Sequence, residues 1–153
     1  MAFLYICSSK LKNMYHFIQK FHSGWAYIAL LLLVFAVINS FIGKSSDREF
    51  TGKDRKIALF GLIGVHVQLL VGIILYFVSP LGLASAGNMA ESDVRITWLE
   101  HPIINILAIA LVTIGWIKHK KADTNKVKFN SIAIFYLIGL VLVLSRIPWK
   151  LWF

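Results

Sequence analysis

Four long runs of apolar residues constrain the fold of this chain more than any other feature of its sequence. They cover residues 24–42, 57–78, 101–117 and 132–147, and each is close to the roughly 20 residues that an α-helix needs to cross a bilayer. Backbone N–H and C=O groups find no water in lipid, so each run is predicted to be a helix. The chain of 153 residues is 58% hydrophobic, which is too apolar for a soluble domain.

The connections between the runs predict how the helices are arranged. Residues 43–56 join the first run to the second, residues 118–130 join the third to the fourth, and the longer connection 79–100 opens with Ser79-Pro80. Short connections make neighbouring helices antiparallel. We therefore expect an all-α integral membrane protein, an antiparallel four-transmembrane-helix bundle that forms a single membrane domain over residues 1–153.

Basic residues are concentrated in two of these connections. Of the 16 Lys and Arg residues, ten lie in residues 43–56 and 118–130. The excess of cations beside cytoplasmic ends of spans predicts that both loops are cytoplasmic and both termini outside. Since the cations lie between apolar runs, they indicate a lipid bilayer as the partner and no nucleic acid. The contrast is stronger if translation starts at Met14 rather than Met1, and the sequence leaves both starts open.

Two of the predicted helices carry stripes of small or polar residues at heptad spacing. One stripe consists of His101, Asn105, Ala108, Val112, Gly115 and His119, and the other of His22, Ala26, Ala29, Leu33, Ala36 and Ser40. Small residues let membrane helices approach closely, and polar residues avoid lipid, so both stripes are expected to face the bundle interior. Simple helix-on-helix packing explains the same periodicity.

The two histidines at the tops of these stripes suggest a metal-ligand pair. With the predicted topology, His22 and His101 lie at the same outer end of the bundle on diagonal helices. Two imidazoles that face each other across a bundle suit bis-histidine ligation of a b-type haem. Haem propionates would then need cations, for which Arg146 is the first choice and Arg95 the second. The alternative is that both histidines are ordinary interfacial residues.

Three further residues carry weaker predictions. Glu100 either accepts a hydrogen bond from the His101 ring or is a solvated carboxylate. His66 lies near mid-membrane, on the face opposite Gly64 and Gln68, and is either a third ligand or relay or a neutral imidazole bonded to a neighbouring helix. His119, within a cationic run, is expected to contact lipid headgroups.

Several classes of function lack support in the sequence. No Lys, Asp or Glu lies within the four runs, which argues against a retinal Schiff base and against a carboxylate-based ion or proton relay. No nucleophile–histidine–acid set of a hydrolase is recognisable, and the single Cys7 excludes an internal disulfide.

Several short stretches resemble known membrane proteins. His22-Ser-Gly-Trp25, His66 with Gln68 and Gly72, Glu100-His101-Pro102, and Leu144-Ser-Arg-Ile-Pro-Trp149 resemble small four-helix bacterial membrane proteins described as cytochrome b-like. The alternate helices topped by histidine also resemble, more distantly, one half of the haem A synthase four-helix unit. Here the Glu adjoins His101 and no Arg follows either histidine, so this second resemblance implies haem binding rather than haem A synthesis.

The leading hypothesis is therefore a b-type cytochrome-like protein of the bacterial inner membrane. It would bind haem b through His22 and His101 near the outer face, with contributions from His66, Arg146 and Glu100, and transfer electrons to or from other membrane or respiratory subunits. The alternative is a non-enzymatic accessory subunit that packs against a larger membrane complex. A small transporter or channel-like module is a third hypothesis.

Overall fold

Four long helices and several short helical segments form the computed structural model. It describes the backbone of residues 2–152 and the side chains of residues 10 and 12–152. The long helices are α1 (Ala2–Ser45), α2 (Gly52–Val78), α4 (His101–Lys120) and α5 (Asn125–Ser145). The short elements are the 3₁₀ turn η1 (Leu83–Ser85), α3 (Ser92–Arg95), the π-helical segment η2 (Ile96–Glu100) and α6 (Trp149–Trp152).

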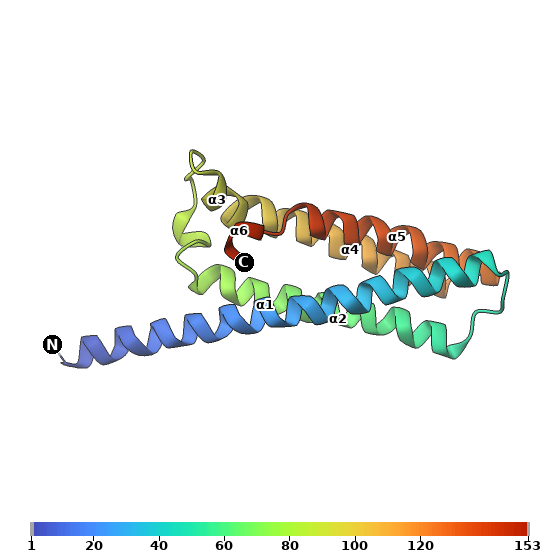
Figure 1. Ribbon diagram of the computed structural model, residues 1–153, viewed down its shortest axis with the longest axis horizontal. Coiled ribbons are helices and arrows are strands. Elements are labelled where there is room, and N and C mark those ends of the chain that lie inside the picture. Colours follow the sequence, from blue (N-terminus) through green and yellow to red (C-terminus); the bar gives the residue numbers. More distant parts are fainter. Residues whose placement is uncertain (1, 153) are drawn as a thin grey trace.

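The long helices pack antiparallel as a bundle, which confirms the predicted fold class (Figure 1). α1 packs against α2 and α5, and α4 packs against the same two helices, so α1 and α4 lie diagonally across the bundle. The N-terminal part of α1 extends beyond the other helices, as Figure 1 shows. Four helical stretches are long and apolar enough to cross a membrane, namely Lys12–Ser45, Gly52–Val78, Ser92–Lys120 and Asn125–Ser145.

Helix starts differ from the predicted boundaries because local polar contacts extend the helices. α2 begins five residues before the apolar run, where Asp54 accepts hydrogen bonds from the backbone N–H and the hydroxyl of Thr51 at 2.9 and 2.7 Å. α5 begins at Asn125 because the hydroxyl of Thr124 accepts a hydrogen bond from Val127 N–H at 3.3 Å. Capping of this kind satisfies N–H groups that have no partner within the helix.

A partly buried ion pair ties the first connection to the bundle. Arg48 donates to both carboxylate oxygens of Asp54, at 2.7 and 2.8 Å, and to Asn39 of α1 at 3.0 Å. Asn39 also donates to Asp54, at 2.9 Å, and Asp54 is only 3% exposed. These hydrogen bonds to the carboxylate raise the pKa of Arg48 above its usual value. The charges of Asp54 and Arg48 therefore neutralise each other at the end of the bundle that carries the first connection.

Close approach of the helices relies on small residues, as the stripes predict. The interior stripe of α1 is buried, with Ala29, Leu33, Ala36 and Ser40 between 0% and 3% exposed. A Cβ added to Gly61 of α2 would lie 3.3 Å from the Cβ of Ala36, so the two helices touch at these small residues.

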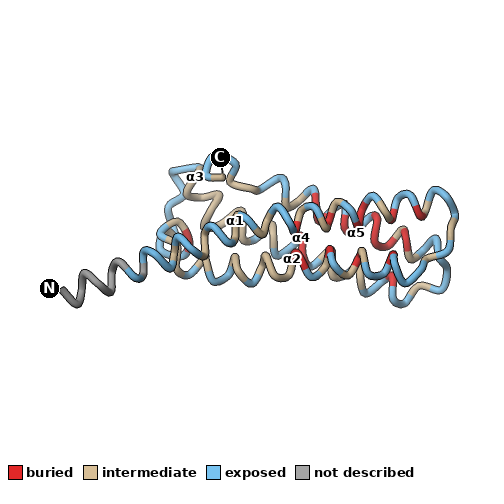
Figure 2. Tube along the Cα trace, turned by 60° about the horizontal axis from the view of Figure 1, so that its bottom comes forward, coloured by how far each residue is buried: buried red, intermediate tan, exposed pale blue. Residues whose placement is uncertain are grey.

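The buried core occupies only one half of the bundle (Figure 2). Within the described parts of the long helices, buried residues begin at Ala29 in α1 and at Ala108 in α4, and they end at Val65 in α2 and at Leu140 in α5. All of these positions lie toward the end that carries the two short connections. The opposite end, which carries His22 and His101, lacks such a core.

Candidate functional site

A cavity of about 530 Å³ occupies the half of the bundle that lacks the buried core. Its walls come from α1, α2, η2, α4, the last turns of α5 and the segment that leads into α6. Most of the lining is apolar, and the polar side chains His22, Gln68, His101 and Asn105 reach it from three helices. A volume of about 300–1,000 Å³ with few convergent polar groups is typical of small-molecule and cofactor sites.

His22 and His101 face each other in this cavity. Their ring centroids are 6.3 Å apart and the ring planes are nearly perpendicular, at 78°. The two side chains come from the diagonal helices α1 and α4, so the structure brings together the pair that the sequence suggested. Two metal–nitrogen bonds of about 2 Å would place ring centres roughly 6 Å apart, so the spacing fits a shared metal.

The ring of His101 is fixed by the end of α5. Its Nδ1 lies 2.7 Å from the main-chain oxygen of Arg146, the residue that caps α5. A carbonyl only accepts hydrogen bonds, so this shorter contact favours the tautomer with the proton on Nδ1 and a free lone pair on Nε2, whereas the amide nitrogen of Asn105, 3.1 Å from the same Nδ1, is the longer contact. Histidines that bind metals commonly donate their other N–H to a carbonyl in this way. Asn105 adds a hydrogen bond of 2.7 Å to the His101 carbonyl one turn earlier.

A π-helical segment leads directly into His101. Pro102, at the start of α4, has no N–H to bond the preceding turn, and η2 (Ile96–Glu100) precedes it in a continuous helical stretch. Single π-helical turns of this kind occur within α-helices and are frequently found at functional sites. The sequence places residues 92–100 in a connection, whereas the structure has a continuous helical stretch from Ser92 to Lys120.

His22 is held by two residues of α2 that sequence reasoning did not connect with it. Gln68 donates to the main-chain oxygen of His22 at 3.1 Å, and its amide nitrogen lies 3.3 Å from Nε2 of the ring. Gly72, one turn further along α2, leaves room for the imidazole. The sequence does contain a signal for this contact, because Gln68 and Gly72 share a helix face with Gly64. A face of small and polar residues is expected to point into the bundle, where His22 is also expected.

Two polar atoms at this contact have no partner. Among the described residues, Nδ1 of His22 and Oε1 of Gln68 are both buried without a hydrogen bond. Burying a polar group without a partner costs about 1–3 kcal/mol, and a strained contact, a bound water or a bound ligand each accounts for such atoms. Both atoms belong to residues that line the cavity.

Glu100 organises the charges beside the cavity instead of contacting the His101 ring. Its carboxylate oxygens pair with Arg95 at 2.8 Å and with Arg146 at 3.2 Å. The prediction that Glu100 accepts the ring N–H is therefore wrong, because the Arg146 carbonyl takes that proton. Glu100 instead pairs with the side chain of Arg146, the residue whose carbonyl contacts the ring. Arg146 and Arg95, the predicted propionate partners, lie together at this ion pair.

The remaining histidines lie elsewhere. His66 contacts the carbonyl of Leu62 at 2.8 Å and the hydroxyl of Thr113, in α4, at 3.4 Å, and it is not among the residues that line the cavity. The structure thus does not bring His66 to the other two. His119 is 3% exposed and packs against Trp116 and Phe50, so the prediction that it contacts lipid headgroups is wrong. His16 is exposed on α1.

No larger set of protein ligands accompanies the two histidines. Within the part of the chain that the structure describes, no group of three or more His, Cys, Asp or Glu side chains is placed to hold a metal ion. A structural zinc site usually takes four protein ligands, whereas a haem brings its own equatorial nitrogens and needs only axial ones. The donor set therefore fits haem iron better than a bare ion.

Comparisons with protein-family models, with curated proteins and with solved structures found no match to this chain. The structure establishes a four-helix protein whose helices are long and apolar enough to span a membrane. The resemblance to cytochrome b-like proteins stays a prediction.

Proposed function

We propose that this protein is a b-type cytochrome-like membrane protein that binds one haem b between His22 and His101 and transfers electrons. The observation that carries the proposal is the pair of imidazoles, 6.3 Å apart between ring centroids, in an apolar cavity of about 530 Å³. Redox cofactors in helix bundles are held in this manner by side chains from facing helices.

The state of the two rings supports axial ligation. His101 already has its proton on Nδ1 and a free Nε2, which is the form that binds iron. His22 is half-buried, and its Nδ1 is buried without a hydrogen-bond partner among the described residues. If Nε2 of His22 bound the iron, it would lose its 3.3 Å contact with the amide nitrogen of Gln68. The hydrogen bond from Gln68 to the main-chain oxygen of His22 would remain.

Haem, when bound, would supply a one-electron redox couple, and the protein would hold it and exclude water. Mostly apolar walls would limit the access of water to a bound haem, which strengthens the influence of nearby charges on a redox potential. Arg95 and Arg146 would balance the propionates, with Glu100 reducing their net charge and keeping them in place. We place the site near the outer face of a bacterial inner membrane, with residues 43–56 and 118–130 cytoplasmic, where other membrane or respiratory subunits would exchange electrons with it.

Absorption spectroscopy tests the proposal. The purified protein in detergent, supplied with haem during expression, should show the sharp reduced-minus-oxidised bands of a bis-histidine b haem at about one haem per chain. His22→Ala and His101→Ala should each abolish these bands, whereas His16→Ala, which removes an exposed histidine of the same helix α1, should keep them.

A folded, haem-supplemented wild-type protein without these bands would contradict the proposal. It would favour the alternative of a non-enzymatic accessory subunit within a larger membrane complex. Bands that survive both His22→Ala and His101→Ala would instead show that haem binds elsewhere on the protein.

A further inference from the structure

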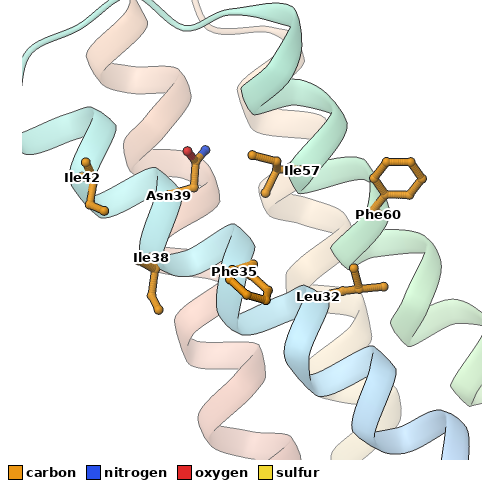
Figure 3. A pocket seen from close by; sticks show the side chains of 7 residues that line it. All are labelled: Leu32, Phe35, Ile38, Asn39, Ile42, Ile57 and Phe60. Atoms are coloured by element: carbon orange, nitrogen blue, oxygen red, sulfur yellow. The ribbon is translucent and has the colours of Figure 1, made fainter.

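An apolar groove runs along the outer side of the α1–α2 pair, and none of the residues that line it also lines the cavity. It has a volume of about 390 Å³ and is lined by Leu32, Phe35, Ile38, Asn39, Ile42, Ile57 and Phe60 (Figure 3). Phe35, Ile38 and Phe60 are 61%, 50% and 55% exposed, so these side chains are available to a ligand in the bilayer.

Two lysines continue the groove toward the end of the bundle. Lys53 lies one turn before Ile57 on α2, and Lys56 lies one turn before Phe60, so both share the face that lines the groove. Side chains of a helix lean toward its N-terminus, so both ammonium groups extend toward the first connection. Both lysines are exposed, and within the described residues neither forms an ion pair, whereas nearby Arg48 is paired with Asp54.

We propose that this surface binds an anionic phospholipid, with an acyl chain in the groove and the phosphate between Lys53 and Lys56. The apolar lining matches a hydrocarbon chain, and the lysines match a negative headgroup at the point where the membrane surface begins. A lipid with this head and tail is the ligand that satisfies both parts of the surface.

The side chains of the groove favour a lipid over another membrane helix. Membrane helices that pack closely present small residues to each other. The small residues of this pair, Ala36 and Gly61, already meet inside the α1–α2 contact. The groove itself is bordered by the large side chains Phe35 and Phe60, which keep a second helix backbone at a distance but leave space for a flexible chain.

Thermal unfolding in a zwitterionic detergent tests this site without reference to haem. Phosphatidylglycerol added to the purified protein should raise Tm in a saturable manner, and equal amounts of phosphatidylcholine or of glycerol phosphate, which lacks the chains, should not. The double variant Lys53→Gln/Lys56→Gln should weaken the apparent affinity for phosphatidylglycerol roughly tenfold or more. The matched variant Lys120→Gln/Lys121→Gln removes two exposed cations from the other connection and should behave like the wild type.

Ile38→Trp tests the acyl-chain part of the site. The exposed Ile38 lines the groove, so the larger side chain of tryptophan should fill part of it and weaken binding while Lys53 and Lys56 remain. If the control variant Lys120→Gln/Lys121→Gln lost as much affinity for phosphatidylglycerol as Lys53→Gln/Lys56→Gln, the lipid would be attracted by the overall positive charge. That result would overturn the proposal. So would stabilisation by glycerol phosphate alone, or a wild-type dimer that Ile38→Trp dissociates, which would assign the groove to a second copy of the chain. Each outcome is independent of whether haem binds.

Discussion

Gly72 lies so close to His22 that a Cβ added to the glycine would be 3.1 Å from Cε1 of the imidazole and 3.6 Å from Nδ1. This contact joins α2 to a side chain of α1 in the cavity. A methyl group at residue 72 would push the ring from its present position. Because the ring is the proposed ligand, this position should influence haem binding more than it influences folding.

Gly72→Ala should therefore lower haem affinity by roughly 10–100-fold, the range found when groups that support metal ligands are altered. Haem titration of the purified protein, followed by absorbance, measures the change. Gly24→Ala is the matched control, because a Cβ at Gly24 of α1 meets no atom within 4 Å. Equal haem affinity in the two variants would mean that the ring position of His22 does not matter for binding.

Glu100→Gln should raise the reduction potential of the bound haem. The substitution removes a negative charge beside His101 and releases Arg95 and Arg146 from their ion pairs, so the ferric state loses electrostatic support. A spectroscopic redox titration measures the shift. Asp93→Asn also removes an acid, but its pair with Lys150 is exposed, so this control should change the potential much less. An unchanged potential in Glu100→Gln would argue against a haem near this ion pair.

Tyr136→Phe should destabilise the packed half of the bundle by about 0.6–1.5 kcal/mol, the usual range for one hydrogen bond between membrane helices. The hydroxyl of Tyr136 is buried and donates to the carbonyl of Ala58 at 3.0 Å. Unfolding of the detergent-solubilised protein measures the loss. Tyr27→Phe, at a side chain that is 48% exposed, should stay close to the wild type. Haem binding should be unaffected, since neither Tyr136 nor Ala58 lines the cavity.

Asp54→Ala should cost about 2–4 kcal/mol, because it leaves Arg48 without its carboxylate and removes the cap of α2. The partial exposure of Arg48, whose side chain is 36% accessible, keeps the loss below that of a fully buried pair. Chemical or thermal unfolding measures the effect. Asp123→Ala, an exposed acid in the second connection, should leave stability within experimental error.

The sequence predicts the architecture well because the constraint of the bilayer is strong. Backbone groups in lipid must bond within each span, so apolar length alone defines the four helices. The stripes predict the buried faces, and Ala29, Ala36, Ala108 and Gly115 do lie inside the bundle. The meeting of His22 and His101 follows from the topology and from their places on these stripes.

The finer features depend on contacts between residues far apart in the chain. Gln68 and the carbonyl of Arg146 contact the two histidines only because α2 and the end of α5 lie beside them, and no local pattern indicates which helix meets which ring. His119 lies on an inward stripe, but its cationic neighbours in sequence favour a position at the surface. In the structure Lys118 and Lys120 are exposed, whereas the imidazole packs inward as the stripe predicts. The helices begin at other residues than predicted because single side chains, such as that of Thr124, cap the backbone.

The uneven distribution of the buried core has a consequence for assembly. Local opening of a protein is easiest where few apolar side chains are buried together, and here that region contains the two histidines. The end near the two short connections can therefore fix the order of the helices in the membrane on its own. The end with His22 and His101 would then open without unfolding the rest, so this half of the bundle can rearrange after the chain has inserted into the bilayer.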